Sequence, residues 1–492
     1  MSPKSIAVIG GGITGLAAAY YLKQQSPEHR VQLFESNTRL GGNIITEERD
    51  GFVIDGGPDS FLRTKPYAVN LCRELGLAPK LITTRPEARK VYIAHQGRLE
   101  LMPGGMALAI PTRISPMLKT PILSWLGKLR ILGDLMLDAR ESAPDDDESI
   151  EGFVARRFGQ EVADKIAGPL LGGIYAGDVG QLSLRSTFPQ LAELEAKYRS
   201  VILGMLLSQK PPDRAGAQTL GQLSPQEIFQ WLTRAEAAAP SPFYSLEGGM
   251  GSLIAALHRS LRPEDVHVGA RVERLLQLPG KRWQLQFSGN SSEAPVREPC
   301  DVDAILLAAP ARVAAKLLAQ RELAEELSSI PYVSTATVFF ALNQEDVAHP
   351  LDGLGFIAPK GEAEILAGTW VSSKWEHRAP PGKALVRAFL GGSRGTVKLA
   401  GAADAELEGV ALSELERLMG PLGTPLFSKV FRYMNSNPQP VVGHMGRLAR
   451  IRAHASRLGR LELAGAAYEG VGIPDCIRQA KTAAERLLQE LC

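Results

Sequence analysis

The hydrophobic positions of the chain change their spacing several times along its length. A continuous apolar run at 6–9 is typical of a strand that is buried on both faces of a parallel sheet. Helix formers fill 16–22, and a second apolar run follows at 31–34. The beginning of the chain therefore predicts strand, helix and strand, in the order of a βαβ unit.

The same signals return later in the chain. We expect strands in five further segments: 91–94, 99–102, 266–273, 282–287 and 304–310. Pro and Gly divide 111–200 into several short helices, and 210–225, which is rich in Pro, Gly and Gln, is expected to be a loop. A last strand at 461–465 leads into a helix that begins at Pro474, because Pro is favoured in the first helical turn.

A glycine-rich turn lies between the first strand and the first helix. Gly10 permits a tight turn, Gly12 lets backbone N–H groups approach a pyrophosphate, and Gly15 lets the helix pack closely on the strand. The pyrophosphate would lie at the helix N-terminus, where unpaired N–H groups favour an anion. Glu35, directly after the second strand, can accept hydrogen bonds from ribose hydroxyls, and its charge disfavours the 2′-phosphate of NADP. The pattern predicts a dinucleotide site.

Composition narrows the class of protein. A chain of 492 residues exceeds what one hydrophobic core usually covers, so we expect two or three domains. Its 45% hydrophobic and 22% charged residues are those of an ordinary globular protein, and a net charge of +2 gives no reason to expect a nucleic acid partner. The four cysteines and eight histidines are dispersed, so we expect reduced thiols and no bound metal.

The sequence also bears on the cellular location. No segment approaches the roughly eighteen apolar residues of a membrane span. The first strand begins by Ile6, which leaves no room for a secretory signal peptide. Apolar residues between Met102 and Trp125 fit either packing in the core or a peripheral contact with a membrane. We therefore expect a cytoplasmic protein, with or without membrane association.

Two further glycine pairs follow the dinucleotide fingerprint. One, Gly41-Gly42, comes shortly after Arg39, and the other begins the segment 56–61. At these offsets the chain resembles the glutathione-reductase-like flavoproteins of the amine oxidase and porphyrinogen oxidase group, which implies FAD rather than NAD. The resemblance and the fingerprint together place the cofactor at these residues: Gly10, Gly11, Gly12, Ile13, Thr14, Gly15, Glu35, Ser36, Arg39, Gly41, Gly42, Asn43, Gly57, Pro58, Asp59, Ser60, Val272, Tyr433, Ala466, Val471, Gly472 and Ile473.

Segment 168–189, with its Gly-Ile-Tyr-Ala-Gly-Asp sequence, is the most specific stretch. Together with 198–205, 246–250 and 467–477 it resembles the oxygen-dependent porphyrinogen oxidases of haem biosynthesis. The chain departs from the family pattern at Pro440, where an aromatic ring is lost, while Tyr433 keeps an aromatic that can lie against the flavin.

The resemblance implies an α/β fold. A discontinuous glutathione-reductase-like FAD-binding domain would be combined with a sheet-based substrate domain and an inserted helical domain. The implied boundaries are 1–85, 244–311 and 440–492 for the FAD-binding domain, 86–104, 222–243 and 312–439 for the substrate domain, and 105–221 for the helical, membrane-type insertion.

The resemblance also implies the reaction. Three rounds of hydride transfer from a porphyrinogen to FAD, with O2 as acceptor and H2O2 released, would give the porphyrin. No catalytic residue is assigned, because the flavin carries the chemistry and neither a nucleophile triad nor a metal is required. In the family the backbone of 471–473 lies against the flavin pyrimidine, where the dipole of the last helix stabilises the negative charge of the reduced form.

The substrate carries propionates, and arginine binds carboxylates bidentately. Between positions 85 and 130 basic residues outnumber acidic ones, and we select Arg89 first and Lys90 second as propionate ligands, with solvated surface charge as the alternative. Gly172 and Gly173 would form a wall that admits a flat ring, with a simple helix break as the alternative.

Several alternatives remain open on sequence alone. An amine oxidase or a carotenoid desaturase would share this fold, and a non-catalytic flavin-fold carrier belongs to a different class. The similarity favours coproporphyrinogen III over protoporphyrinogen IX as the substrate. The sequence leaves open whether the chain forms a homodimer.

Overall fold

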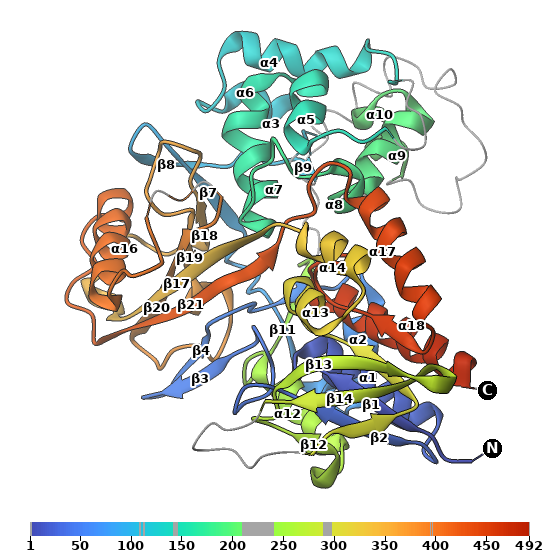
Figure 1. Ribbon diagram of the computed structural model, residues 1–492. Coiled ribbons are helices and arrows are strands. Elements are labelled where there is room, and N and C mark those ends of the chain that lie inside the picture. The colour runs from blue at the N-terminus through green and yellow to red at the C-terminus, as the bar shows by residue number, and fades with distance from the viewer. Residues whose placement is uncertain are drawn as a thin grey trace.

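The computed structural model describes residues 2–107, 110–111, 114–140, 146–208, 241–288, 298–393, 395 and 397–491. Figure 1 shows three parts: a parallel sheet with its helices near both chain termini, a larger sheet beside it, and a group of helices at the opposite end from the termini. Two of our sequence predictions, the loop at 210–225 and most of the substrate-domain segment 222–243, lie outside the described residues.

The parallel sheet has five strands in the order β12-β2-β1-β16-β22, and all four pairings are parallel. Strand β1 is central: β2 lies on one side of it and β16 on the other. The strand order therefore reverses at β1, and ligands bind at the carboxyl end of the strands at such a switch point. The elements are β1 Ser5–Ile9, α1 Ile13–Gln25, β2 Arg30–Phe34, β12 Val266–His267, β16 Ala304–Leu307, β22 Leu461–Leu463 and α18 Ile473–Leu491.

Helices cover both faces of this sheet. On one face α1 packs against α18 and α12, and α18 packs against α2. Helix α1 is buried almost all round because its small alanines allow close contact. The other face is covered by α13, α14, α17 and a three-stranded antiparallel sheet. These elements are α2 Pro66–Glu74, α12 Gly251–Ser260, α13 Ala311–Leu317, α14 Arg321–Ser328, α17 His444–Leu458, β13 Val272–Leu278, β14 Arg282–Phe287 and β15 Cys300–Val302.

Two strand expectations are wrong in their extent. The strand predicted over 304–310 ends at Leu307. The single strand predicted over 266–273 is interrupted, because Gly269 adopts a φ of +67° and turns the chain from β12 into β13. The two pieces belong to different sheets.

The larger sheet has seven strands in the order β21-β17-β20-β19-β18-β7-β8. One face is apolar under helix α16, and the other faces the hairpin β3-β4 and the segment that follows it. The elements are β3 Thr46–Arg49, β4 Phe52–Asp55, β7 Lys90–His95, β8 Arg98–Leu101, β17 Tyr332–Asn343, β18 Gly353–Ile357, β19 Ala367–Trp370, α15 Val371–Lys374, β20 Lys383–Gly391, α16 Asp404–Met419 and β21 Phe427–Pro438.

The helical part is built from short segments between Met106 and Ser208. Its elements are β9 Met106–Ala107, β10 Ile110–Pro111, α3 Ile114–Lys119, α4 Trp125–Ile131, η2 Leu132–Leu135, α5 Ile150–Phe158, α6 Gln160–Val162, η3 Ala163–Ala167, α7 Gly168–Tyr175, α8 Leu184–Thr187, α9 Pro189–Tyr198 and α10 Val201–Ser208. The remaining elements are β5 Phe61–Leu62, η1 Ala78–Lys80, β6 Leu81–Thr83, β11 Phe243–Leu246, η6 Pro263–Asp265, η7 Pro279–Lys281 and η8 Gln344–Asp346.

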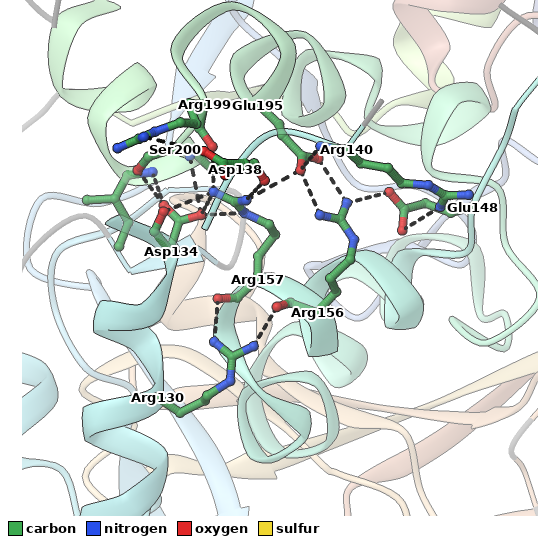
Figure 2. Close-up of polar contacts among 12 residues, drawn as sticks. Arg130, Asp134, Asp138, Arg140, Glu148, Arg156, Arg157, Glu195, Arg199 and Ser200 are labelled. Carbon is green, nitrogen blue, oxygen red and sulfur yellow. Dashed lines mark hydrogen bonds and ion pairs between the residues drawn. The ribbon is translucent and has the colours of Figure 1, made fainter. Parts of the chain in front are cut away.

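A buried ion cluster holds these short helices together (Figure 2). The Arg157 guanidinium lies 2.6 Å from Asp134 Oδ1, and both side chains are fully buried. Asp134 also accepts hydrogen bonds from the Ser200 hydroxyl and the Ile202 backbone N–H, while Arg156 forms a two-point pair with Glu195. Because they are paired and hydrogen-bonded to one another, these charged side chains fix η2, α5, α9 and the start of α10 relative to one another.

Among the described residues, no helix combines the length and the apolar character needed to cross a bilayer.

Candidate cofactor and substrate site

The turn between β1 and α1 has the geometry that the fingerprint requires. Gly10 has a φ of +109°, and a Cβ added to Gly15 would lie 1.8 Å from the Gly10 carbonyl oxygen, so both positions need glycine. A Cβ at Gly12 would meet only the Gly42 Cα, at 4.0 Å. Gly12 is also the N-cap of α1 and offers no side-chain cap. The space and the unpaired amides beside Gly12 thus fit a pyrophosphate.

Glu35 lies at the end of β2, at the same edge of the sheet. Its Oε2 accepts the Gly11 N–H at 2.6 Å, and its Oε1 accepts the backbone N–H and the side-chain amide of Asn37, both at 2.7 Å, and the Ser36 hydroxyl at 3.2 Å. These bonds hold the carboxylate in place. Because a carboxylate has about four acceptor positions, Oε2 keeps capacity for a ribose hydroxyl.

The segment after β2 folds back onto the glycine turn. The Gly41 N–H donates to the Gly11 carbonyl at 2.8 Å, and Gly41 and Gly42 both have positive φ. Arg39 is exposed and donates to the backbone carbonyls of Leu40 and Gly42, at 3.2 and 2.7 Å. Asn43 is exposed close by. The predicted residues 39–43 therefore lie beside Gly12, where the fingerprint places the pyrophosphate.

Asp59, within the predicted cofactor segment 57–60, lies at the centre of a polar cluster. Its carboxylate accepts hydrogen bonds from Lys374 Nζ at 2.9 Å, from the Trp375 indole at 3.2 Å and from the Ser60 hydroxyl at 2.8 Å. Burial by itself raises the pKa of Asp59, but the positive charges of Lys374 and Arg387 outweigh it and hold the pKa well below its ordinary value. Asp59 is therefore ionised at neutral pH.

Tyr433 on β21 faces the same segment. Its hydroxyl lies 3.2 Å from the position that a Cβ on Gly57 would take, and the hydroxyl oxygen is buried without a hydrogen-bond partner among the described residues. Burial raises the pKa of Tyr433 to about 12, so the phenol stays protonated. A buried donor without a partner fits a site that is completed by a ligand with acceptor atoms. Val272, the other predicted residue from this part of the chain, is buried at the start of β13.

The turn 465–473 connects β22 to α18. Gly465 has a φ of +146°, and no atom lies within 4 Å of the position of a Cβ on it; Ala466, Val471 and Gly472 are partly exposed, and Ile473 is buried. The Lys65 ammonium lies 2.8 and 2.6 Å from the two Asp475 carboxylate oxygens and thereby ties the end of segment 57–65 to the first turn of α18. The N-termini of α1 and α18 thus lie on the same face of the sheet, and both favour an anion.

Helix α7 of the helical part contacts β18 of the larger sheet. Gly172 is buried, whereas Gly173 is exposed and has no atom within 4 Å of the position of a Cβ. Leu170 of α7, Ile357 of β18 and Val471 of the C-terminal turn pack against the same hydrophobic cluster. Gly173 therefore presents open space on α7, the helix whose Leu170 packs against the same cluster as Ile357 and Val471.

The two basic residues predicted to bind propionates differ in their surroundings. Arg89 is exposed just before β7. The Lys90 ammonium is paired with Asp352, which also accepts a hydrogen bond from the Tyr92 hydroxyl at 2.9 Å. The pKa of Lys90 is raised by these bonds. The charge of Lys90 is therefore already balanced by the carboxylate of Asp352.

Sequence reasoning missed Lys374 and Arg387. Arg387 interrupts an apolar run at 384–390, and a charged residue within a buried strand pattern is a signal that could have identified it. Lys374 carries no such signal, because its partner Asp59 is more than three hundred positions away.

Comparison with known proteins gives matches over almost the whole chain. Residues 13–488 match the family described as flavin containing amine oxidoreductase. Coproporphyrinogen III oxidase of Bacillus subtilis (strain 168) is 35% identical over 494 residues, which cover 99% of this chain and 98% of that protein. Protoporphyrinogen oxidase of Bos taurus is 32% identical over 508 residues, which cover 99% and 98%.

Solved structures agree in fold. The crystal structure of a candidate protoporphyrinogen oxidase from Exiguobacterium sp. 255-15 superposes with a TM-score of 0.83, 31% identity and coverage of 100% of this chain and 99% of that chain. A UDP-galactopyranose mutase superposes with a TM-score of 0.70 at 16% identity, covering 99% of this chain and 96% of the mutase. The second likeness concerns the fold alone, since the same architecture serves different chemistry.

Proposed function

Because the chain belongs to the family of flavin containing amine oxidoreductases, we propose that it is an FAD-dependent porphyrinogen oxidase, with coproporphyrinogen III favoured over protoporphyrinogen IX. The family match confirms the predicted oxidoreductase class and flavin cofactor, and the superposed structures confirm the α/β fold. Support for coproporphyrinogen III comes from relatives of that name at 34–35% identity, against 32% for the bovine protoporphyrinogen oxidase. The predicted cofactor and substrate residues remain predictions.

One observation carries the proposal: α7 contacts β18 and bears Gly173, which is exposed with no atom within 4 Å of the position of a Cβ. Leu170 of the same helix packs against the hydrophobic cluster that Ile357 and Val471 also contact. A flat, largely apolar macrocycle needs such a wall without side chains opposite the redox-active ring. An enzyme for small amines would have no need of a glycine wall beside a large helical part.

The chain's own residues supply binding and orientation. FAD, when bound, would accept a hydride equivalent from a methylene bridge of the substrate and pass the electrons to O2. The amides after Gly12 would hold the pyrophosphate, Glu35 would accept from the ribose, and the helix dipole of α18 would favour negative charge beside Gly472. No residue of the site is needed as a nucleophile, since orientation and exclusion of water are what the protein adds.

Arg89 would bind a propionate at the edge of the site. It is exposed, and its planar guanidinium can bind a carboxylate through two parallel hydrogen bonds. The four propionates of coproporphyrinogen III would offer it more partners than the two of protoporphyrinogen IX.

We further propose that the protein is cytoplasmic and that α4 touches a membrane surface. Of the residues that the sequence offered for this contact, Ile110, Met117, Ile122 and Leu123 are buried, whereas Leu118 and Trp125 are exposed. Helix α4 carries the exposed apolar side chains Trp125, Leu126 and Leu129, at 70%, 79% and 62%, and Lys128 lies over the Trp125 ring. Apolar side chains beside a basic residue fit an anionic lipid surface.

Parallel turnover assays with coproporphyrinogen III and protoporphyrinogen IX, followed by porphyrin fluorescence, would test the proposal. We expect both O2 consumption and fluorescence, with the larger kcat/KM for coproporphyrinogen III. Consumption of an amine or a polyene with no porphyrin formed would reject it. A chain that binds FAD but oxidises neither porphyrinogen would point to the carrier alternative.

A further inference from the structure

Arg387 is a charged residue in the middle of the larger sheet. It lies on β20, is only 5% exposed, and faces the segment after β4 rather than the apolar side under α16. Its Nη2 donates to the Gly57 carbonyl oxygen at 2.9 Å, and its Nε is buried without a hydrogen-bond partner among the described residues. Burying a guanidinium is unfavourable unless an anion or a full set of acceptors compensates the charge.

The two neighbouring carboxylates form their ion pairs with other cations. Asp55 is paired with Arg378 at 3.2 Å, and Asp59 is paired with Lys374 at 2.9 Å. Among the described residues, no ion pair within 4.0 Å is formed by Arg387. Three cations therefore face two anions along segment 55–60, which leaves one positive charge in excess.

Two aromatic rings hold the guanidinium in place. Its Cζ lies 4.0 Å from the centroid of the Phe389 ring and 5.3 Å from that of Phe339. Cation–π contacts of this kind are attractive but do not neutralise a charge. Burial lowers the pKa of Arg387, and the carboxylate of Asp59 partly opposes this. The site thus keeps a fixed positive charge beside Gly57 and the unpartnered hydroxyl of Tyr433.

We propose that Arg387 is the residue whose charge stabilises the anionic form of the reduced flavin. This inference rests on the proposed cofactor site, in which 57–60 and Tyr433 lie along the flavin. A hydride carries two electrons and one proton from the substrate carbon to the neutral oxidised flavin, which becomes an anion, while a pyrrole N–H of the oxidised substrate releases its proton to solvent. Transfer of the two electrons to O2, together with the hydrogen on the flavin and one proton from solvent, would return the flavin to its neutral oxidised form and give H2O2.

Sulfite is a suitable probe because it needs no porphyrinogen. It donates an electron pair to the oxidised flavin, and the negative charge passes into the flavin ring as it does on reduction. The holoenzyme and its Arg387→Gln and Arg387→Lys variants would be titrated with sulfite, with loss of flavin absorbance as the signal. Gln keeps a donor for the Gly57 carbonyl but lacks the charge; Lys keeps both.

We expect Arg387→Gln to raise the Kd for sulfite about tenfold or more. A buried unit charge beside the flavin acts through a lower dielectric constant than that of water. A tenfold change corresponds to about 30 mV in a two-electron reduction potential, which a dye-linked potential measurement would detect. Arg387→Lys should stay within about threefold of the wild type.

Arg432→Met is the matched control. Arg432 lies on the neighbouring part of the same sheet, but it is paired with Asp404 and donates to backbone carbonyls near α16. Its loss should leave the sulfite Kd unchanged. The proposal is overturned if Arg387→Gln behaves like Arg432→Met, or if Arg387→Lys loses as much affinity as Arg387→Gln. Failure to oxidise porphyrinogens would affect the proposed function alone, because sulfite binding requires only bound FAD.

Discussion

The Nε2 atom of His444, the first residue of α17, lies 3.2 Å from the carbonyl oxygen of Tyr468 in the C-terminal turn. His444 is buried, and burial lowers its pKa although the bonds to the Tyr468 and Ala467 backbone oppose this. The imidazole is therefore neutral in the folded protein, and its N–H can hold the turn that leads into α18. His444 is a positioning residue for the predicted flavin turn.

Replacing His444 should loosen that turn. We expect His444→Phe to weaken FAD binding by about tenfold, because a buried carbonyl left without a donor costs about 1–3 kcal/mol. Fluorescence of released flavin would give the Kd. His454→Phe, at a less buried position on the same helix, is the control and should change little. Equal FAD affinity in all three proteins would contradict the positioning role.

The neutral state of His444 also predicts a pH dependence. Its pKa is lower in the folded than in the unfolded chain, so unfolding takes up a proton as the pH falls below about 6.5. Its contribution to the free energy of unfolding is therefore complete above that pH and is lost progressively below it. The difference between wild type and His444→Gln in urea unfolding should shrink from pH 7.5 to pH 5.

Alanine at Gly12 should affect FAD binding, whereas alanine at Gly15 should affect the stability of the fold. Gly12→Ala introduces a Cβ that meets no protein atom closer than 4.0 Å, so the chain should fold normally but bind FAD at least tenfold more weakly. Gly15→Ala would press against the Gly10 carbonyl and should lower the melting temperature. Thermal unfolding of the apoprotein and FAD titration separate the two effects. Normal FAD affinity in Gly12→Ala would remove Gly12 from the cofactor site.

Gly173 should matter for substrate and not for folding. Gly173→Leu places a side chain into open space, so stability should be unchanged or slightly higher because glycine is a poor helix former. Porphyrinogen turnover should fall at least tenfold, since the added side chain would occupy the expected ring position. Retained FAD absorbance shows that the cofactor site is intact. Undiminished kcat/KM would show that the macrocycle lies elsewhere.

Arg89 and Lys90 form a natural pair of test and control. Arg89→Ala should raise KM for the porphyrinogen about tenfold with little change in kcat, because propionate binding is nearly equal in the ground and transition states. Lys90→Ala removes a charge that Asp352 already neutralises, so its KM should change less than threefold. The reverse ranking would reassign the propionate ligand to Lys90.

The buried ion pair between Arg157 and Asp134, drawn in Figure 2, should contribute more to the stability of the helical part than the exposed pairs do. Arg157→Met leaves Asp134 as an uncompensated buried charge and should lower the free energy of unfolding by about 3–5 kcal/mol. Arg140→Ala breaks ion pairs with Asp146 and Glu148 in which the Arg140 side chain is 40% exposed, and it should cost under about 1 kcal/mol. Denaturant unfolding measures both, and similar losses would show that the buried pair has no special weight.

The sequence by itself determined the local framework of the cofactor site. The run before Gly10, the spacing to Gly15 and the acid at Glu35 predict a strand, turn, helix and strand, because short-range sterics of glycine and the period of apolar positions fix these elements. The structure has these elements in the predicted order, with β1 at Ser5–Ile9, α1 at Ile13–Gln25 and β2 at Arg30–Phe34. The strand predicted over 266–273 failed at Gly269, where a positive φ mattered more than the apolar pattern.

Only the tertiary structure decided which charged side chains are paired within the protein and which are not. Lys90 and Arg89 are neighbours in sequence, yet Asp352, which is 262 positions from Lys90, neutralises one of them and not the other. Asp59 is likewise satisfied by Lys374, and this leaves Arg387 as the buried charge in excess. The physical reason is that electrostatic compensation depends on distance in space, whereas local patterns record only distance along the chain.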